Sequence, residues 1–288
     1  ARPEDIAKYR GKFKMGWEEM RRQRFARQRE MGLADSSWSL SDTDSASYNW
    51  DAADQDWEDH RMAVYAAMID RMDWNIGRLL AALAEAGEAE NTIVLFLSDN
   101  GGCSEEPGGR NPKVEPGVKE NYTAVGPAWG WAKNSPFRRY KSWVHEGGIC
   151  TPLIVHWPGR VEGGSITRQP GHIIDLMPTL LELAGGEYPA EYEGNEILPV
   201  EGKSLAPVFR GEQRKPHELL CWEWSGNRAA RAGDWKLVWD SRVKKWALFD
   251  LSVDRCETND LAAEHPERAR ELEQAWNEWA VRTGVRSN

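Results

Sequence analysis

The sequence of 288 residues has no long apolar run and no excess of positive charge. No segment approaches the roughly 20 consecutive apolar residues that a membrane-spanning helix needs. The net charge of -9 argues against nucleic-acid binding as the main function. The first residues, Ala1 to Asp5, do not have the charge and apolar pattern of a signal peptide. These absences leave a globular protein with room for one large domain or two smaller ones.

The cysteines lack the spacing of a zinc site. No two of them form a Cys-x-x-Cys pair, which is the usual signature of structural zinc. An even number permits disulfides, but the spacing does not require them. The four are Cys103, Cys150, Cys221 and Cys256.

A basic segment, residues 1–34, is followed at once by an acidic one. The pattern predicts a helix over Trp17–Glu30. The basic side chains of this helix could form a patch that binds nucleic acid or a membrane, or a solvated helix face. The acidic segment that follows favours the solvated face. The acidic stretch from Asp35 to Asp59 lacks the spacing of an EF-hand. It predicts a long surface loop near a substrate cleft.

Strong helical periodicity comes next, over residues 58–86, with Gly87 placed to end the helix. The apolar run after it predicts a buried strand that stops at Ser98-Asp99-Asn100-Gly101-Gly102. In open α/β sheets, ligands bind just beyond the carboxyl ends of strands. Asp99 and Asn100 offer hard oxygen atoms that suit Ca²⁺ or Mg²⁺. The same residue types also form ordinary turns, so this stretch alone leaves a plain turn open.

Two more candidates precede a second apolar strand, predicted near residues 151–157, after a long loop over 101–136 rich in glycine and proline. Lys141 would supply a compact positive charge for an anionic ester. His145 would donate a proton or a hydrogen bond. Each residue alone fits an exposed or structural role equally well.

The remaining sequence predicts a helix that ends at Ala184, with Asp175 as its N-cap, and then a change of pattern. Four short strands are expected over 219–224, 228–231, 235–239 and 246–250, as an antiparallel sheet. A helix over 265–282 closes the chain. We therefore expect two domains, 1–211 and 212–288.

An ordered series of motifs resembles the type I sulfatases, and bacterial arylsulfatases most closely. The resemblance implies an α/β fold with a partial alkaline-phosphatase-like central sheet flanked by helices, and a smaller C-terminal antiparallel sheet with a helix. The matching motifs span residues 65–73, 75–80, 95–102, 136–141, 145–149, 151–154, 172–179, 226–229, 233–238 and 248–251.

The resemblance implies roles for the candidate residues. Asp99 and Asn100 match two ligands of a Ca²⁺ ion, with Mg²⁺ less favoured, and Lys141 matches a lysine that contacts the sulfate. His145 is a weaker catalytic candidate. The implied substrate is an aryl, steroid or sugar sulfate, the reaction is hydrolysis of a sulfuric ester, and the implied location is periplasmic or secreted.

The nucleophile is the main departure from the family. Its formylglycine arises in a Cys/Ser-x-Pro/Ala-x-Arg motif that no Cys or Ser of this sequence completes. Cys150-Thr151-Pro152 begins such a motif, but Ile154 stands where Arg is required. We interpret Cys150 as a small core residue. The resemblance therefore implies the C-terminal part of a sulfatase, partnered by an N-terminal segment that carries the nucleophile.

For the 288 residues alone we expect no turnover. We expect weak Ca²⁺ affinity, because two oxygen ligands are too few. We also expect poor solubility, because the central sheet would have an unpaired edge strand and exposed apolar faces. Two other functions stay open. One is a phosphodiesterase or phosphonate monoester hydrolase of the same superfamily. The other is a non-catalytic binding protein that reuses the fold, with its Trp-rich surface on sugars. Trp224 stands where close relatives often have His, and it fits either a substrate contact or a domain interface.

Overall fold

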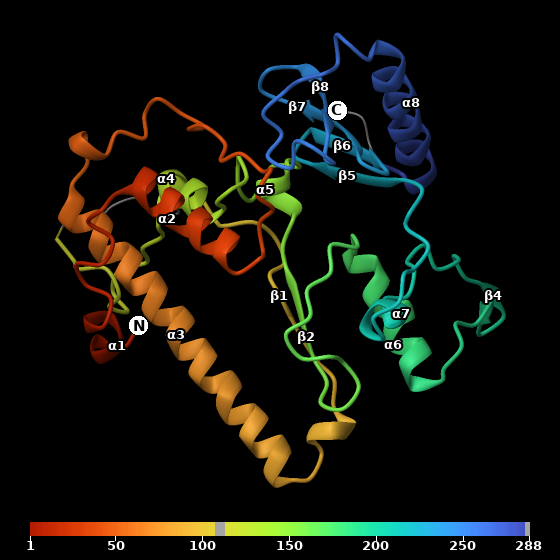
Figure 1. Cartoon of the computed structure of the whole chain (residues 1–288), viewed down its shortest axis with the longest axis horizontal. Coiled ribbons are helices and arrows are strands. Elements are labelled where there is room, and N and C mark those ends of the chain that lie inside the picture. Colours follow the sequence, from red (N-terminus) through yellow and green to blue (C-terminus); the bar gives the residue numbers. More distant parts are fainter. Residues whose placement is uncertain (107–112, 286–288) are drawn as a thin grey trace. The chain divides into compact units, whose positions relative to one another are not determined.

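The computed structural model describes residues 1–106 and 113–285 (Figure 1). The chain divides into two compact units. The first comprises residues 1–81, 98–152 and 219–288, and the second comprises 82–97 and 153–218. The predicted boundary between residues 211 and 212 stays a prediction. Within the described ranges, no helix has the length and apolar character needed to cross a membrane.

Aromatic side chains build the core of the N-terminal part of the first unit. Trp129 is fully buried and meets Phe13, Trp17 and Trp50 edge-on. Edge-to-face pairs of this kind stabilise a core beyond their buried area. The helices and turns here are α1 (Pro3–Ala7), α2 (Trp17–Glu30), η1 (Trp50–Ala52), α3 (Gln55–Glu85), α4 (Gly126–Lys133) and α5 (Glu146–Ile149).

Helix α2 has the predicted bounds, and α3 has them within three residues. The apolar face of α3 is nevertheless only partly buried. Met62 is 4% exposed, whereas Ile69 and Met72 are each 43% exposed. Periodicity forms the helix locally, but burial needs a partner, and the described residues supply none for this part of the face.

The predicted loop over 101–136 is partly wrong, because it contains α4; its residues 107–112 lie outside the described residues. Gly126 and Pro127 start this helix, with Gly126 at φ 76°. A Cβ at Gly130 would lie 3.0 Å from the Cβ of Ser104. Glycine and proline therefore serve a helix start and a close contact here.

The predicted C-terminal sheet is confirmed. Its strands pair antiparallel in chain order, and α8 packs on one face through Leu272, Trp276 and Ala280 (Figure 1). Val144 packs with the other face. The elements are β5 (Leu220–Trp224), β6 (Asn227–Ala232), β7 (Trp235–Asp240), β8 (Lys245–Asp250) and α8 (Pro266–Thr283).

In the second unit, the predicted burial of the two apolar strands is wrong. They pair antiparallel with each other, and Phe96 and Ile154 are 40% and 58% exposed. Among the described residues this sheet has two strands, so its faces lack cover. The unit contains η2 (Ala89–Asn91), β1 (Val94–Leu97), β2 (Leu153–His156), η3 (Ile173–Asp175), α6 (Leu176–Ala184), β3 (Glu191–Tyr192), β4 (Asn195–Glu196) and α7 (Ala206–Phe209).

Asp175 precedes α6 as predicted, but its side chain does not cap that helix. The buried carboxylate instead accepts hydrogen bonds from the backbone N–H groups of His172 and Lys203, at 2.9 and 2.8 Å. It also pairs with Arg214 at 2.9 Å and His217 at 2.7 Å. Asp175 therefore ties together three separate segments of the second unit.

Candidate functional site

Asp99 and Asn100 lie in an irregular bend that directly follows β1. The hydroxyl of Ser98 donates to the carbonyl oxygen of Asn100 at 2.9 Å, and the hydroxyl of Thr151 donates to that of Ser98 at 2.9 Å. The Asp99 side chain is exposed, and Asn100 is half-buried. Neither side chain makes a hydrogen bond or ion pair within the part of the chain that the structure describes. Their oxygen atoms are thus available to a ligand.

Main-chain contact holds this bend against the turn of α5. The N–H of Gly101 donates to the carbonyl oxygen of Gly148 at 2.9 Å. A Cβ built on Gly101 would lie 1.8 Å from the carbonyl oxygen of Gly147. Only glycine permits so close an approach. The Gly101-Gly102 and Gly147-Gly148 pairs of the sequence therefore meet at one place.

Asn134, just after α4, links the bend to the segment that carries Lys141. Its Oδ1 accepts from the N–H of Gly102 at 2.8 Å, and its Nδ2 donates to the carbonyl oxygen of Arg139 at 3.0 Å. The N–H of Lys141 also donates to the carbonyl oxygen of Gly102 at 3.2 Å. The structure therefore brings Asp99, Asn100 and Lys141 together.

The Lys141 segment is held in an uncommon backbone conformation. Arg139 and Ser142 have φ angles of 65° and 77°. A non-glycine residue in such a region costs on the order of 1–3 kcal/mol unless its surroundings fix it, and such residues cluster at functional sites. Here the fixing contacts are amides: Asn134 binds the Arg139 carbonyl, and Asn227 Nδ2 donates to the Ser142 carbonyl at 3.2 Å.

Lys141 itself remains a cation. Its Nζ lies 2.9 Å from Oε1 of Glu105, and its side chain is one-third exposed. The hydrogen bond to Glu105 raises the pKa of Lys141, and the nearby Asp99 carboxylate adds to that effect. The amine is therefore charged at neutral pH and reachable by an anion that displaces Glu105.

His145 lies in the interior, 4% exposed, with its ring edge-on to Trp143. Burial lowers its pKa well below the usual value, and the cations of Arg138, Lys236 and Arg139 lower it further. Its Nδ1 has no hydrogen-bond partner in the described part of the chain. The imidazole is thus neutral, and its catalytic role stays a prediction.

A buried charge network beside His145 is the feature that the sequence did not reveal. Lys236 on β7 contacts Glu146 at 2.7 Å and Glu257 at 2.8 Å, and all three are almost fully buried. Arg255 contacts the other oxygen of Glu146 at 2.7 Å. Glu146 precedes Lys236 by 90 residues and Glu257 by 111, so no local pattern predicts the network. The network fixes α5, whose glycines hold the Asp99 bend.

Cys150 belongs to the same network. Its Sγ accepts from Nη2 of Arg255 at 3.2 Å, and burial raises its pKa to about 11. A thiol with such a pKa is a poor nucleophile at neutral pH. All four cysteines are free, so the permitted disulfides do not form.

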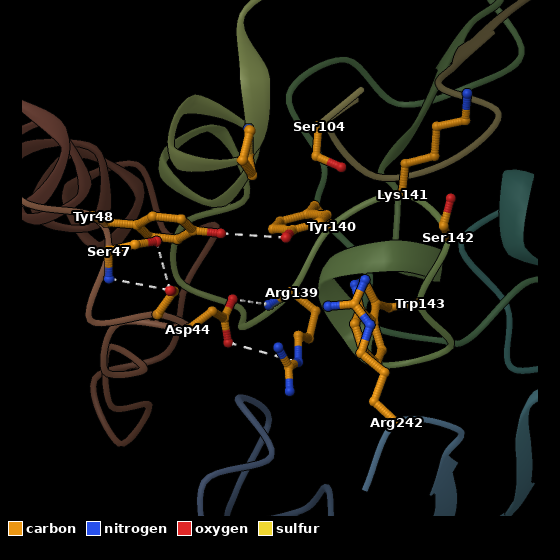
Figure 2. A pocket seen from close by; sticks show the side chains of 12 residues that line it. Asp44, Ser47, Tyr48, Ser104, Arg139, Tyr140, Lys141, Ser142, Trp143 and Arg242 are labelled. Carbon is orange, nitrogen blue, oxygen red and sulfur yellow. Dashed lines mark hydrogen bonds and ion pairs between the residues drawn. The ribbon is translucent and has the colours of Figure 1, made fainter. Parts of the chain in front are cut away.

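A pocket of about 500 Å³ opens along the Lys141 segment (Figure 2). The acidic stretch contributes one wall of this pocket, and the expectation that it borders a substrate cleft stays a prediction. Figure 2 shows the hydroxyls of Tyr48 and Tyr140 turned toward each other, 3.2 Å apart. The lining residues are Asp44, Ser45, Ser47, Tyr48, Ser104, Pro127, Arg139, Tyr140, Lys141, Ser142, Trp143 and Arg242. Trp224 is absent from this lining and is 57% exposed at the end of β5.

The donor chemistry at Asp99 and Asn100 fits part of a calcium site. Carboxylate and amide oxygens are typical Ca²⁺ ligands, and the ion takes six to eight oxygens. Within residues 1–106 and 113–285, no group of three or more His, Cys, Asp or Glu could hold a metal ion. The two side chains offer too few oxygens for a complete coordination shell, and their role as metal ligands stays a prediction.

Comparisons with family models and with curated proteins find sulfatases. The family model described as Sulfatase matches residues 2–186, and that described as N-sulphoglucosamine sulphohydrolase, C-terminal, matches 137–279. An uncharacterized sulfatase of Schizosaccharomyces pombe is 31% identical in a match that covers 98% of this chain and 55% of the length of that sulfatase. The arylsulfatase of Klebsiella aerogenes is 30% identical over 73% of this chain and 48% of its own. This chain thus spans about half the length of these relatives.

A solved structure in complex with its substrate D-glucosamine-2-N,6-O-disulfate is similar in fold. Its TM-score is 0.55 at 24% identity, covering 90% of this chain and 45% of that one. The likeness confirms the predicted fold class, a partial alkaline-phosphatase-like α/β fold. Because the Sulfatase model covers most of the sequence, the chain belongs to the sulfatase family.

Proposed function

We propose that the complete protein hydrolyses a sulfate monoester, with this chain supplying part of the metal site and the sulfate-binding lysine. One observation carries the proposal. Asp99 and Asn100, whose side chains make no hydrogen bond or ion pair with the described residues, are linked through Asn134 and Gly102 to the cationic Lys141. A cation beside a hard-metal site suits an ester that carries negative charge on its oxygens.

Asp99 and Asn100 would hold Ca²⁺ through their side-chain oxygens. The ion would supply positive charge to the sulfate oxygens. Lys141 would bind the sulfate and stabilise charge that develops on the leaving oxygen, after exchange of its contact with Glu105. The network around Glu146 would keep these groups in position. Segments outside this chain would supply the remaining metal ligands and the formylglycine nucleophile.

The family membership supports a sulfuric ester as substrate. The relative from Klebsiella is named an arylsulfatase, and a neighbour in fold is bound to a disulfated glucosamine. The alcohol part of the substrate is therefore an aryl group or a sugar in our proposal. The polar lining of the pocket favours the sugar, because serine and tyrosine hydroxyls can pair with sugar hydroxyls.

The test uses the full-length gene product and an aryl sulfate. We expect release of sulfate, loss of activity with a calcium chelator, and a fall of about 100-fold or more in kcat for Lys141→Ala, as for other lost charge-stabilising groups. Lys119→Ala is the matched control, since Lys119 is 92% exposed and lies outside the pocket. Full activity of Lys141→Ala, or faster cleavage of the matching phosphate ester, would overturn the proposal.

A further inference from the structure

Cationic side chains outnumber carboxylates in the lining of the pocket, although the chain as a whole carries a net charge of -9. Its lining includes the cations Arg139, Lys141 and Arg242 but a single carboxylate, that of Asp44. A concentration of one sign of charge in a hollow raises the local concentration of ligands of the opposite sign. The pocket therefore favours an anion against the charge of the whole chain.

Arg139 and Arg242 differ in their ion-pair partners. The guanidinium of Arg139 faces Asp44 at 3.8 Å and Asp240 at 3.3 Å. The side chain of Arg242 makes no ion pair within the described residues and is exposed. It lies over the Trp143 ring, 4.7 Å from the ring centroid. The ring thus orients a cation whose charge is not neutralised.

Lys141 and Arg242 lie at different places along the pocket. Figure 2 shows them apart, with Ser142 between them. A single sulfate bound at Lys141 would leave Arg242 without an anion. A ligand with two separated negative groups would engage both cations.

We propose that Arg242, oriented by Trp143, binds a second anionic group of the substrate, and that the substrate is therefore an acidic saccharide with a sulfate or carboxylate besides the sulfate to be cleaved. Planar guanidinium groups recognise both anions through paired hydrogen bonds. This inference rests on the proposed function, since it places the sulfate to be cleaved at Lys141.

Binding to the full-length protein, measured by titration calorimetry with a calcium chelator present, tests it without turnover. The probes are glucosamine 6-sulfate, glucosamine-2-N,6-O-disulfate, and a monosulfated disaccharide that carries a uronic acid. We expect the two dianionic probes to bind more tightly than glucosamine 6-sulfate. Arg242→Gln should weaken the dianions about tenfold, the value of one hydrogen-bonded charge contact, and leave the monosulfate unchanged. The dianion affinity of Arg242→Lys should lie between that of the unchanged protein and that of Arg242→Gln.

Lys244→Gln is the matched control, because it removes one charge from the same turn but does not line the pocket. If the Lys244 and Arg242 variants lose the same dianion affinity, the effect would come from the overall charge of the chain, and the inference would be overturned. The absence of binding of either dianion at millimolar concentration would also overturn it. The two proposals fail separately. If Arg242→Gln leaves dianion binding unchanged while Lys141→Ala lowers activity, this inference alone is removed. If Lys141→Ala leaves activity unchanged, the proposed function is contradicted.

Discussion

Asn134 holds two loops with one side chain. Its amide accepts from Gly102 and donates to Arg139, so it sets both the bend after β1 and the uncommon backbone before Lys141. No other described side chain touches both loops in this way. We therefore propose that Asn134 is a positioning residue, which acts through these two loops.

Replacing Asn134 with Ala should lower the free energy of unfolding by about 1–3 kcal/mol, because it leaves a half-buried N–H and a carbonyl without partners. Urea unfolding followed by fluorescence measures the change. In the full-length protein, kcat should fall more than KM rises. Asn195→Ala serves as control, since that side chain makes one exposed contact within its own turn. A variant as stable as the original chain would contradict the role.

At this scale, residue type and position made Asp99, Asn100 and Lys141 candidates, the resemblance to the sulfatases supplied their roles, and those roles stay predictions. The sequence did not predict Asn134, Arg242 or Glu257. Their roles depend on partners far along the chain, and an asparagine or arginine is common on any surface. The environment of His145 was equally invisible, since burial comes from distant segments.

Among the elements, β7 and the short α5 turn depend on each other through buried charges. Lys236 on β7 neutralises Glu146 and Glu257 at once. Burial opposes ionisation of Glu146, but Lys236 and Arg255 outweigh it and lower its pKa to about 2. The carboxylate is therefore ionised and fully dependent on its partners.

Lys236→Met should destabilise the first unit by about 3–5 kcal/mol, because removal of one partner leaves buried carboxylates uncompensated. Thermal and urea unfolding would show the loss. Lys244→Met, at an exposed position of the neighbouring turn, should change little. Comparable stability of the two variants would show that the network contributes nothing.

The elements of the second unit depend in a similar way on Asp175. Burial would raise the pKa of this carboxyl, yet hydrogen bonds from Lys203, His172 and His217 and the charge of Arg214 lower it overall. A lowered pKa in the folded state stabilises the protein above the unfolded value of 3.8, and this contribution is lost as the pH falls through the folded value.

We therefore expect the second unit to open below about pH 4 in wild type, and Asp175→Asn to be destabilised already at pH 7. Hydrogen exchange of residues 173–184, compared with β6 as an internal reference, measures both effects. Asp234→Asn provides a control at an exposed turn. Exchange in 173–184 that does not change with this substitution would remove the proposed role of the carboxylate.

Helices and the C-terminal hairpins followed from sequence because their signals are local: periodicity, a glycine stop, turns between short strands. The pairing of β1 with β2 did not. An apolar run indicates a strand but not its partner, its direction or its cover, because these depend on segments distant in the sequence. Helix α4 was hidden for another reason, since its glycines serve close packing as well as turns.

At the scale of the molecule, apolar side chains remain exposed within each unit. In the first unit they include Met68, Ile69 and Met72 on α3, and in the second Phe96 and Ile154 on the two-stranded sheet. Monomeric proteins rarely expose large contiguous apolar patches. A strand edge without a partner adds a route to association.

We expect the 288-residue chain to associate in solution and to bind an apolar dye such as ANS. Light scattering coupled to size-exclusion chromatography measures the first property, and dye fluorescence the second. Replacing Ile154 and Phe96 with Lys should reduce both. A monodisperse, folded monomer without dye binding would show that these surfaces need no cover.

The contact of Gly101 with Gly147 makes the backbone arrangement of the site independent of the side chains that line the pocket. Because the bend meets the α5 turn and Lys141 through main-chain hydrogen bonds, the backbone positions of Asp99 and Lys141 are held together by the main chain as well as by Asn134. Side chains farther along the pocket, Arg242 among them, play no part in these hydrogen bonds. We therefore expect that substitutions of pocket side chains leave the backbone positions of Asp99 and Lys141 unchanged.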